Sequence, residues 1–115
     1  MTHHTKAHDM SAEVAACTEC ATACVETLRH CLAMGGDHVA PDHVSLMQTC
    51  AEICVTSANA MARGTPGHRD ICRACAEICG RCAASCEQFP DDEHMAACAK
   101  ACRRSEASCR AMASG

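Results

Sequence analysis

The spacing of the cysteines constrains this chain more than any other feature of its sequence. Fourteen of its 115 residues are cysteine, and nearly all of them lie three, four or seven positions from the next. Residues three and four apart share one face of an α-helix, with Cβ atoms about 5–6 Å apart. The densest runs, Cys17–Cys31 and Cys72–Cys86, therefore predict helices that each present a stripe of thiols.

Cap and turn residues delimit the first two helices. The first is expected from about Ser11 to Met34, with Ser11 as a possible N-cap and the glycine pair at 35–36 as its stop. The second is expected to open near Pro41 and to end before Gly64.

Two more helices are expected in the second half of the chain. Thr65 and Pro66 read as a cap followed by a proline at the first helical position, so the third helix should run from there to about Gln88. Phe89 and Pro90 then interrupt the chain, and residues 91–93 supply the acidic first turn of a fourth helix that ends near Ala113.

Short connections between helices of similar length are typical of an antiparallel bundle. The chain is therefore predicted to be all-α, an up-down-up-down four-helix bundle in which residues 1–115 form a single domain. Residues 1–10, with His3, His4 and His8, are expected to be a flexible tail rather than a metal scavenger.

A heptad reading of the four helices places every cysteine on an inward stripe, so the core is predicted to be lined by cysteine. A free thiol packs as a small buried hydrophobe, and the chain has one phenylalanine and no tryptophan or tyrosine to fill that space instead. Packing alone explains one or two such residues but not fourteen, so all are predicted to be metal ligands: Cys17, Cys20, Cys24, Cys31, Cys50, Cys54, Cys72, Cys75, Cys79, Cys82, Cys86, Cys98, Cys102 and Cys109.

Thiolates and thioethers are soft ligands that select Cu(I), Zn(II) or iron–sulfur clusters. Cysteine pairs on one helix suit a low-coordinate ion such as Cu(I), whereas structural zinc requires four ligands in a tetrahedron. About one Cu(I) per thiolate also leaves a nearly neutral core, which limits the cost of burying charge. Three alternatives remain: an iron–sulfur electron carrier, a zinc or heavy-metal buffer, and a disulfide scaffold. The C-x₂-C-x₂-C-x₃-C-P run of bacterial ferredoxins is absent, which argues against the first of them.

Composition argues against other classes of function. The net charge is −4 with both signs interspersed, so nucleic-acid binding is not expected. No apolar run approaches the roughly 20 residues of a membrane span. The N-terminus shows no export signal, which predicts a cytoplasmic protein with reduced thiols. No catalytic arrangement stands apart from the cysteine lattice, so the chain is not expected to be an enzyme.

Together with Cys50-Ala-Glu-Ile-Cys54 and Cys98-Ala-Lys-Ala-Cys102, the cysteine runs resemble those of the bacterial copper storage proteins, the Csp family, over roughly residues 11–112. The resemblance implies a four-helix bundle filled with multiple Cu(I) ions, used for copper storage or detoxification and usually assembled as a homotetramer. Because its N-terminus shows no export signal, the chain is similar to the cytosolic branch of the family rather than to the exported one. Family members often carry cysteine at four positions that differ here: Thr27, His43, Met95 and Ser105.

The ends of the stripes carry further candidate ligands. One end gathers residues predicted to be the copper entrance or auxiliary ligands, Met34, His43, Met47, His94 and Met95, with His38 in the nearby loop and Phe89 as a possible plug. Met10, Met61 and Met112 are expected at the opposite end, as core filler or as ligands. Thr27, Ser57 and Ser105 are expected to fill space by bonding to their own helix backbone.

A second stripe on the first helix consists of ordinary hydrophobic residues. Val14, Ala21, Val25, Leu28 and Leu32 follow helical spacing. They are expected either to seal the bundle or to form a subunit contact.

Overall fold

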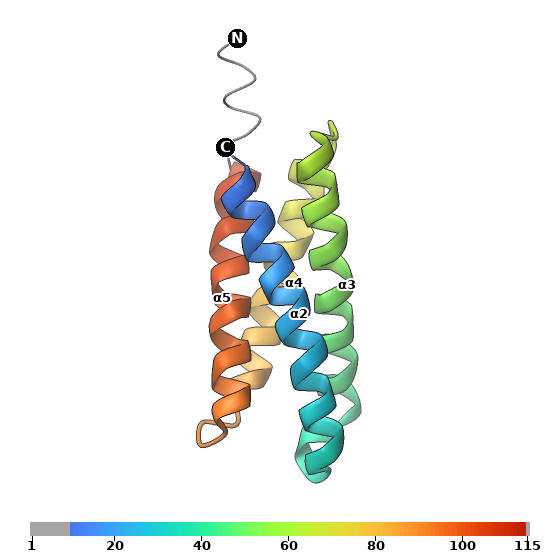
Figure 1. Cartoon of the computed structure of the whole chain (residues 1–115), viewed down its shortest axis with the longest axis vertical. Helices are drawn as coiled ribbons and strands as arrows, with labels where there is room; N and C mark the ends of the chain where they lie inside the picture. Colours follow the sequence, from blue (N-terminus) through green and yellow to red (C-terminus); the bar gives the residue numbers. More distant parts are fainter. Residues whose placement is uncertain (1–9, 115) are drawn as a thin grey trace.

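In a computed structural model, which describes residues 10–114, these residues form four α-helices and one short 3₁₀ helix. In chain order they are α2 (Ser11–Met34), η1 (Gly36–Val39), α3 (Pro41–Arg63), α4 (His68–Cys86) and α5 (Glu93–Ser114). Successive helices run antiparallel, α2 and α4 each pack against α3 and α5, and the predicted four-helix bundle is confirmed (Figure 1). His3, His4 and His8 lie outside the described residues.

The glycine stops after α2 and α3 lie where the sequence predicts them. Gly35 has φ of 70° and its N–H donates to the Cys31 carbonyl at 3.0 Å. Gly64 adopts the left-handed conformation, and the next N–H, of Thr65, reaches back to the Ala60 carbonyl at 3.0 Å. Both glycines have a positive φ, which a residue without a Cβ adopts at no steric cost, so both helices end sharply.

α2 begins at Ser11 as predicted, but its predicted cap is wrong, and so is the predicted start of α4. Met10 rather than Ser11 occupies the N-cap position of α2, and no side chain caps that helix end. The helix after Gly64 begins at His68 rather than Pro66, because residues 65–68 form a turn in which the backbone N–H and Nδ1 of His68 both lie close to the Thr65 carbonyl, at 3.0 and 2.8 Å.

The connection between α4 and α5 spans residues 87–92 and is longer than predicted. α4 ends at Cys86 instead of Gln88, because the N–H groups of Gln88 and Phe89 bond three residues back and close the chain into turns. Asp92 lies just outside α5 and caps it: its Oδ1 accepts hydrogen bonds from the N–H groups of His94 at 3.0 Å and Met95 at 3.2 Å. A carboxylate at this position satisfies N–H groups that have no partner within the helix.

The bundle has two chemically different ends. The end that carries η1 and residues 87–92, at the bottom of Figure 1, is called the η1 end. The other end carries the turn at 64–67, the start of α2 and the end of α5. There Met61 is buried, and Met10 and Met112 are partly buried against the core, as expected of residues that close it.

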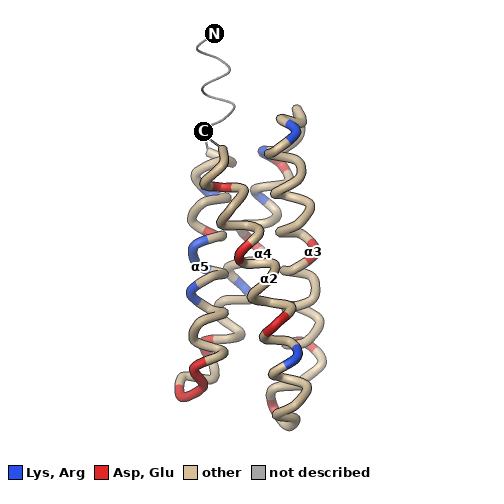
Figure 2. Tube along the Cα trace, viewed as in Figure 1, with Lys and Arg blue, Asp and Glu red and all other residues tan. Residues whose placement is uncertain are grey.

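Charged residues are spread along all four helices (Figure 2), and within residues 10–114 no Lys, Arg, Asp or Glu is buried. Several pair along or between helices, as Arg103 does with Glu87 at 2.7 Å and Glu106 at 2.9 Å. Exposed pairs of this kind contribute about 0–1 kcal/mol each, so the fold depends on its core. Within residues 10–114, none of the helices combines the length and the apolar character that crossing a bilayer requires.

Candidate metal centre

The core of the bundle is made of thiols. All fourteen cysteines are free and at most 1% exposed, and they come from all four helices. Alanines fill much of the space beside them, among them Ala76 and Ala83. The prediction that every cysteine faces inward is therefore confirmed.

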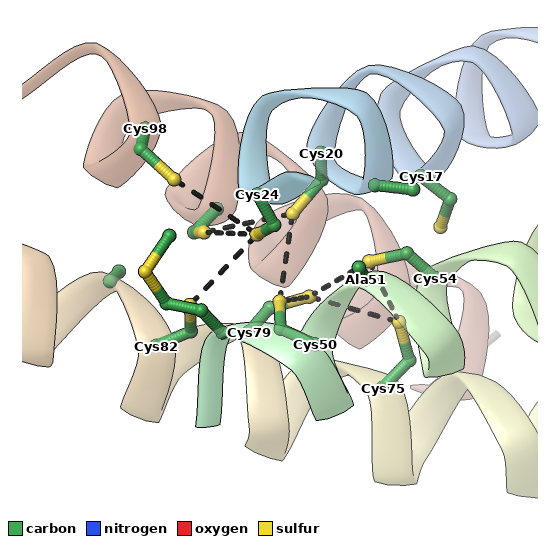
Figure 3. Close-up of a cluster of buried hydrophobic side chains, with 14 of the residues drawn as sticks. Cys17, Cys20, Cys24, Cys50, Ala51, Cys54, Cys75, Cys79, Cys82 and Cys98 are labelled. Atoms are coloured by element: carbon green, nitrogen blue, oxygen red, sulfur yellow. Dashed lines mark hydrogen bonds between the residues drawn. The ribbon is translucent and has the colours of Figure 1, made fainter. Parts of the chain in front are cut away.

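The thiols pair across helices in the middle of the bundle (Figure 3). Two four-cysteine groups have all their sulfur atoms within 4.8 Å of one another: Cys20, Cys24, Cys50 and Cys102, and Cys20, Cys50, Cys54 and Cys79. Because both groups include Cys20 and Cys50, they cannot be two separate tetrahedral sites. Metal ions that fill both groups have to share bridging thiolates.

Cys24 connects this central part to the η1 end. Its Sγ lies 3.8 Å from that of Cys102 and 4.0 Å from those of Cys82 and Cys98. Thr27 follows on the same face of α2 and is buried, so a methyl and a hydroxyl group stand where a further sulfur would continue the chain of thiols.

The other half of the core holds a three-thiol group of Cys17, Cys75 and Cys109. Ser105 lies between this group and the central one, with its Oγ 3.3 Å from the Cys79 sulfur and 3.7 Å from the Cys17 sulfur. Ser57 Oγ similarly lies 3.4 Å from the sulfur of Cys72. The prediction that the hydroxyls of Ser57 and Ser105 bond to their own helix backbone is wrong, because both hydroxyls contact thiols instead.

The distances between sulfur atoms fit single ions. Neighbouring Sγ atoms lie 3.5–4.0 Å apart, as in the pairs Cys54–Cys79 and Cys24–Cys82. A metal–sulfur bond of about 2.3 Å places the sulfurs about 4.0 Å apart in a trigonal site and about 3.8 Å apart in a tetrahedral one. A disulfide needs about 2.05 Å. Iron–sulfur clusters carry their own sulfide and iron atoms between the cysteines, and this spacing leaves no room for them.

A mixed ligand set lies at the η1 end of the thiol core. Around Cys31 Sγ lie Met95 Sδ at 3.6 Å, His43 Nε2 at 3.5 Å and Met47 Sδ at 4.0 Å. The other ring nitrogen of His43 lies 2.6 Å from Ser85 Oγ, which fixes the ring with Nε2 toward the thiol. One thiolate, one imidazole and two thioethers form a soft site of the type that Cu(I) prefers.

The structure thus brings His43, Met47 and Met95 together and leaves out the other two residues predicted at this end. Met34 is 57% exposed, so its predicted place on the inward stripe is wrong: it is the last residue of α2, one turn beyond Cys31. His94 is also exposed, and its ring stacks on that of His30 at 4.2 Å. Both residues line a surface hollow of about 480 Å³ at the η1 end.

Sequence reasoning placed His38 near this end but missed His30 and Asp92, the two residues that His38 contacts or neighbours around this hollow. His30 and His38 converge on Asp92, with Nε2–Oδ2 distances of 2.8 and 2.9 Å. His30 directly precedes Cys31 and falls off the cysteine stripe, and Asp92 reads as part of a helix start. The one available signal was that all three residues belong to segments predicted to meet at one end.

Burial sets the protonation state of the apo site. Removal from water raises the pKa of Cys31 to about 11, and the hydrogen bond with Cys17 raises the pKa of Cys109 to about 12. Burial lowers the pKa of His43, which leaves its imidazole neutral and able to bind a metal at neutral pH. A metal ion that binds Cys31 or Cys109 therefore has to displace a thiol proton.

Comparisons with known proteins agree with this chemistry. The family model described as copper storage protein matches residues 6–114. An uncharacterized cysteine-rich protein of Bacillus subtilis, YhjQ, is 36% identical over 101 residues, which cover 88% of this chain and 93% of that protein.

Two solved structures share both the fold and much of the sequence. A protein of Nitrosospira multiformis superposes with a TM-score of 0.87 at 42% identity, covering 93% of this chain and 96% of its own. The Cu(I)-bound copper storage protein BsCsp3 superposes with a TM-score of 0.85 at 36% identity, covering 90% of this chain and 97% of its own.

Proposed function

The chain belongs to the copper storage protein family, and on that premise we propose that it stores Cu(I) ions in its core, bound by the fourteen buried thiolates. The observation that carries the proposal is the continuity of the sulfur atoms: neighbours lie 3.5–4.0 Å apart from Cys24 through Cys54 to the group of Cys17 and Cys109. Such a lattice suits many bridged ions rather than one catalytic or structural ion.

Charge balance sets the capacity. Each Cu(I) that replaces a thiol proton leaves the local charge unchanged, so a core with about one Cu(I) per thiolate stays nearly neutral. Zn²⁺ at the same density would leave the buried core strongly positive, and isolated Zn(Cys)₄ sites would leave it negative. We therefore expect about 14 Cu(I) ions at saturation.

The ions are proposed to enter at the η1 end. His43, Met47 and Met95 are neutral ligands that do not have to lose a proton at neutral pH, so they can hold Cu(I) beside Cys31 before its thiol is deprotonated. From there the ion would pass to Cys98 and then to Cys24, whose sulfurs lie 4.0 Å apart. Each step moves the ion to a more thiolate-rich set and makes its retention tighter.

We infer that the protein works as a homo-oligomer through α2 and α3. Val14 and Ala21 pack into the bundle, but Val25, Leu32 and Val55 are 61, 62 and 50% exposed. A largely apolar groove of about 580 Å³ runs between the two helices beside Val25 and Val55. Burying such a surface is favourable, and the tetramer implied by the resemblance would cover it. Val25→Glu should lower the mass measured by light scattering in solution; an unchanged mass would exclude this face.

Storage rather than catalysis is the proposed role, in the cytoplasm, where thiols stay reduced. The thiols are buried, whereas a reactive cysteine needs partial exposure and a positive environment. The choice between storage and detoxification depends on what later removes the copper.

An anaerobic titration with Cu(I) against a strong chelator, followed by native mass spectrometry, tests the proposal. Saturation near 14 Cu(I) per chain is expected. Saturation at one to four ions, or a chelator that retains all copper, would contradict it. Zinc that stays bound throughout would favour the zinc buffer, and a brown protein containing sulfide would favour the iron–sulfur carrier.

A matched pair of variants makes the test specific for the lattice. Cys24 has three sulfur neighbours within 4.0 Å, whereas Cys72 contacts the hydroxyl of Ser57. Cys24→Ala should therefore lose more than one Cu(I), and Cys72→Ala at most one. Equal losses from both variants would mean that the thiols bind ions independently.

A further inference from the structure

A second cluster of metal-ligand residues lies at the η1 end, outside the thiol core. His30 of α2 and His38 of η1 both face Asp92, the residue before α5. Both Nε2 atoms lie against the same carboxylate atom, Oδ2, at 2.8 and 2.9 Å. The three side chains are 14–19% exposed, so an ion in solution can reach them.

We propose that His30, His38 and Asp92 bind one divalent transition-metal ion, such as Zn²⁺, at a site separate from the Cu(I) store. Two imidazole nitrogens and a carboxylate oxygen suit divalent ions, whereas thiolates and thioethers select Cu(I). This donor set therefore differs in kind from that around Cys31, which has one nitrogen and three sulfur atoms.

The distances are close to those that an ion requires. Zn–N and Zn–O bonds of about 2.0–2.2 Å place the donor atoms of a tetrahedral site roughly 3.3 Å apart. The two N···O pairs at 2.8 and 2.9 Å would have to open by about half an ångström, which small side-chain rotations achieve. The fourth position is left for water or for the exposed ring of His94.

The ligands are held in place before any ion binds. The ring of His30 stacks on that of His94 at 4.2 Å, and the ring of His38 packs on Phe89 at 4.2 Å. Asp92 is fixed through Oδ1 by the backbone N–H groups that it caps, so Oδ2 remains for the ion. Outer interactions of this kind orient ligands and reduce the ordering cost of binding.

Charge favours the same conclusion. The hydrogen bond with His30 holds the pKa of Asp92 well below its usual range, so the carboxylate is ionised at neutral pH. A divalent ion would take the place of the protons that the two rings now offer to this carboxylate.

Phe89 links the outer cluster to the inner site. Its ring lies 4.2 Å from that of His38 and 5.3 Å from that of His43. An ion on Asp92 would tie together α2, η1 and the start of α5 beside the proposed copper entrance.

The experiment uses the full chain, loaded anaerobically with Cu(I) so that the thiols are occupied, and then titrated with Zn²⁺. Native mass spectrometry should show one Zn²⁺ more on the wild type than on Asp92→Asn. Asparagine caps a helix about as well as aspartate, so this variant keeps the start of α5. The double variant His30→Ala/His38→Ala should lose the same single Zn²⁺.

The matched control is His68→Ala, which removes a partly buried histidine at the opposite end of the bundle, where its ring bonds to the Thr65 carbonyl. This variant should bind as much Zn²⁺ as the wild type. Equal Zn²⁺ on the wild type and on both cluster variants would overturn the proposal, and any binding by His3, His4 or His8 is common to all of them.

Titration with Co²⁺ in place of Zn²⁺ provides a second readout on the same Cu(I)-loaded variants. A site of nitrogen and oxygen ligands should give weak d–d bands without sulfur-to-metal charge transfer. Charge-transfer bands that persist in Asp92→Asn would place the ion on thiols and overturn the proposal. The native mass spectra also give the Cu(I) content of each variant, which reports separately on folding and on the storage function.

Discussion

Replacing Ser105 with cysteine should raise the copper capacity of this protein. Ser105 is fully buried, and its Oγ lies 3.3 Å from the sulfur of Cys79, 3.6 Å from that of Cys54 and 3.7 Å from that of Cys17. The central thiols already reach the group that contains Cys17 through Cys75, whose sulfur lies 3.8 Å from that of Cys54. A sulfur at position 105 would add a second connection between the two groups.

The size of the gain follows from geometry and charge. The sulfurs of Cys54, Cys75 and Cys79 already lie 3.5–3.8 Å apart, so a thiolate at position 105 supplies a fourth donor from which bridging thiolates can bind one more ion. Each added thiolate neutralises one Cu(I), so Ser105→Cys should saturate at about 15 ions instead of about 14. The larger sulfur crowds Cys79 and should cost the apo protein about 1 kcal/mol.

Anaerobic Cu(I) titration with native mass spectrometry resolves a difference of one ion. The control is Ser45→Cys, which adds an exposed thiol without a sulfur neighbour and should leave the tightly bound number unchanged. The reasoning is refuted if Ser105→Cys folds and saturates like the wild type, or if the two variants gain equally.

Three further predictions follow from the η1 end and from burial. The pKa of Cys31 is raised from its ordinary value of 9.0 to about 11, so the contribution of this thiol to apo stability should be complete well below pH 9 and fall by about 2 kcal/mol as pH rises to 11. Urea unfolding of the wild type against Cys31→Ser measures this contribution, and the Cu(I) form, already deprotonated, should not show the loss. His43→Ala should weaken the first Cu(I) bound at this end roughly tenfold without changing the final number by more than one, as chelator competition would show; a large loss of capacity would contradict an entrance role. Asp92→Ala removes the cap of α5 and should cost about 1 kcal/mol, or roughly 4 °C in Tm, while Asp92→Asn should stay close to the wild type.

Local sequence signals predicted the helices because their causes are local. Gly35 and Gly64 end α2 and α3 through backbone conformations that depend on the absence of a side chain. The start of α4 was misplaced because Pro66 fits the first helical position as well as it fits a turn, and only the bonds of His68 to the Thr65 carbonyl decide between them.

The candidate site was predictable in its composition and not in its connections. The spacing of the cysteines requires that they share helix faces, and a bundle has one place to bury those faces. The spacing does not say that Cys24 meets Cys98 or that Ser105 touches Cys17, because these contacts depend on the axial offset between helices. Met34 shows the limit: it has the right period but lies past the end of the core.

The sequence by itself determined a bundle with a thiol core suited to soft metal ions, because helical periodicity and ligand chemistry are properties of the chain alone. Only the tertiary structure decided which thiols bridge one another and that His30, His38 and Asp92 meet. Those three residues come from segments up to 62 positions apart, and no pattern within any one segment encodes where another segment ends.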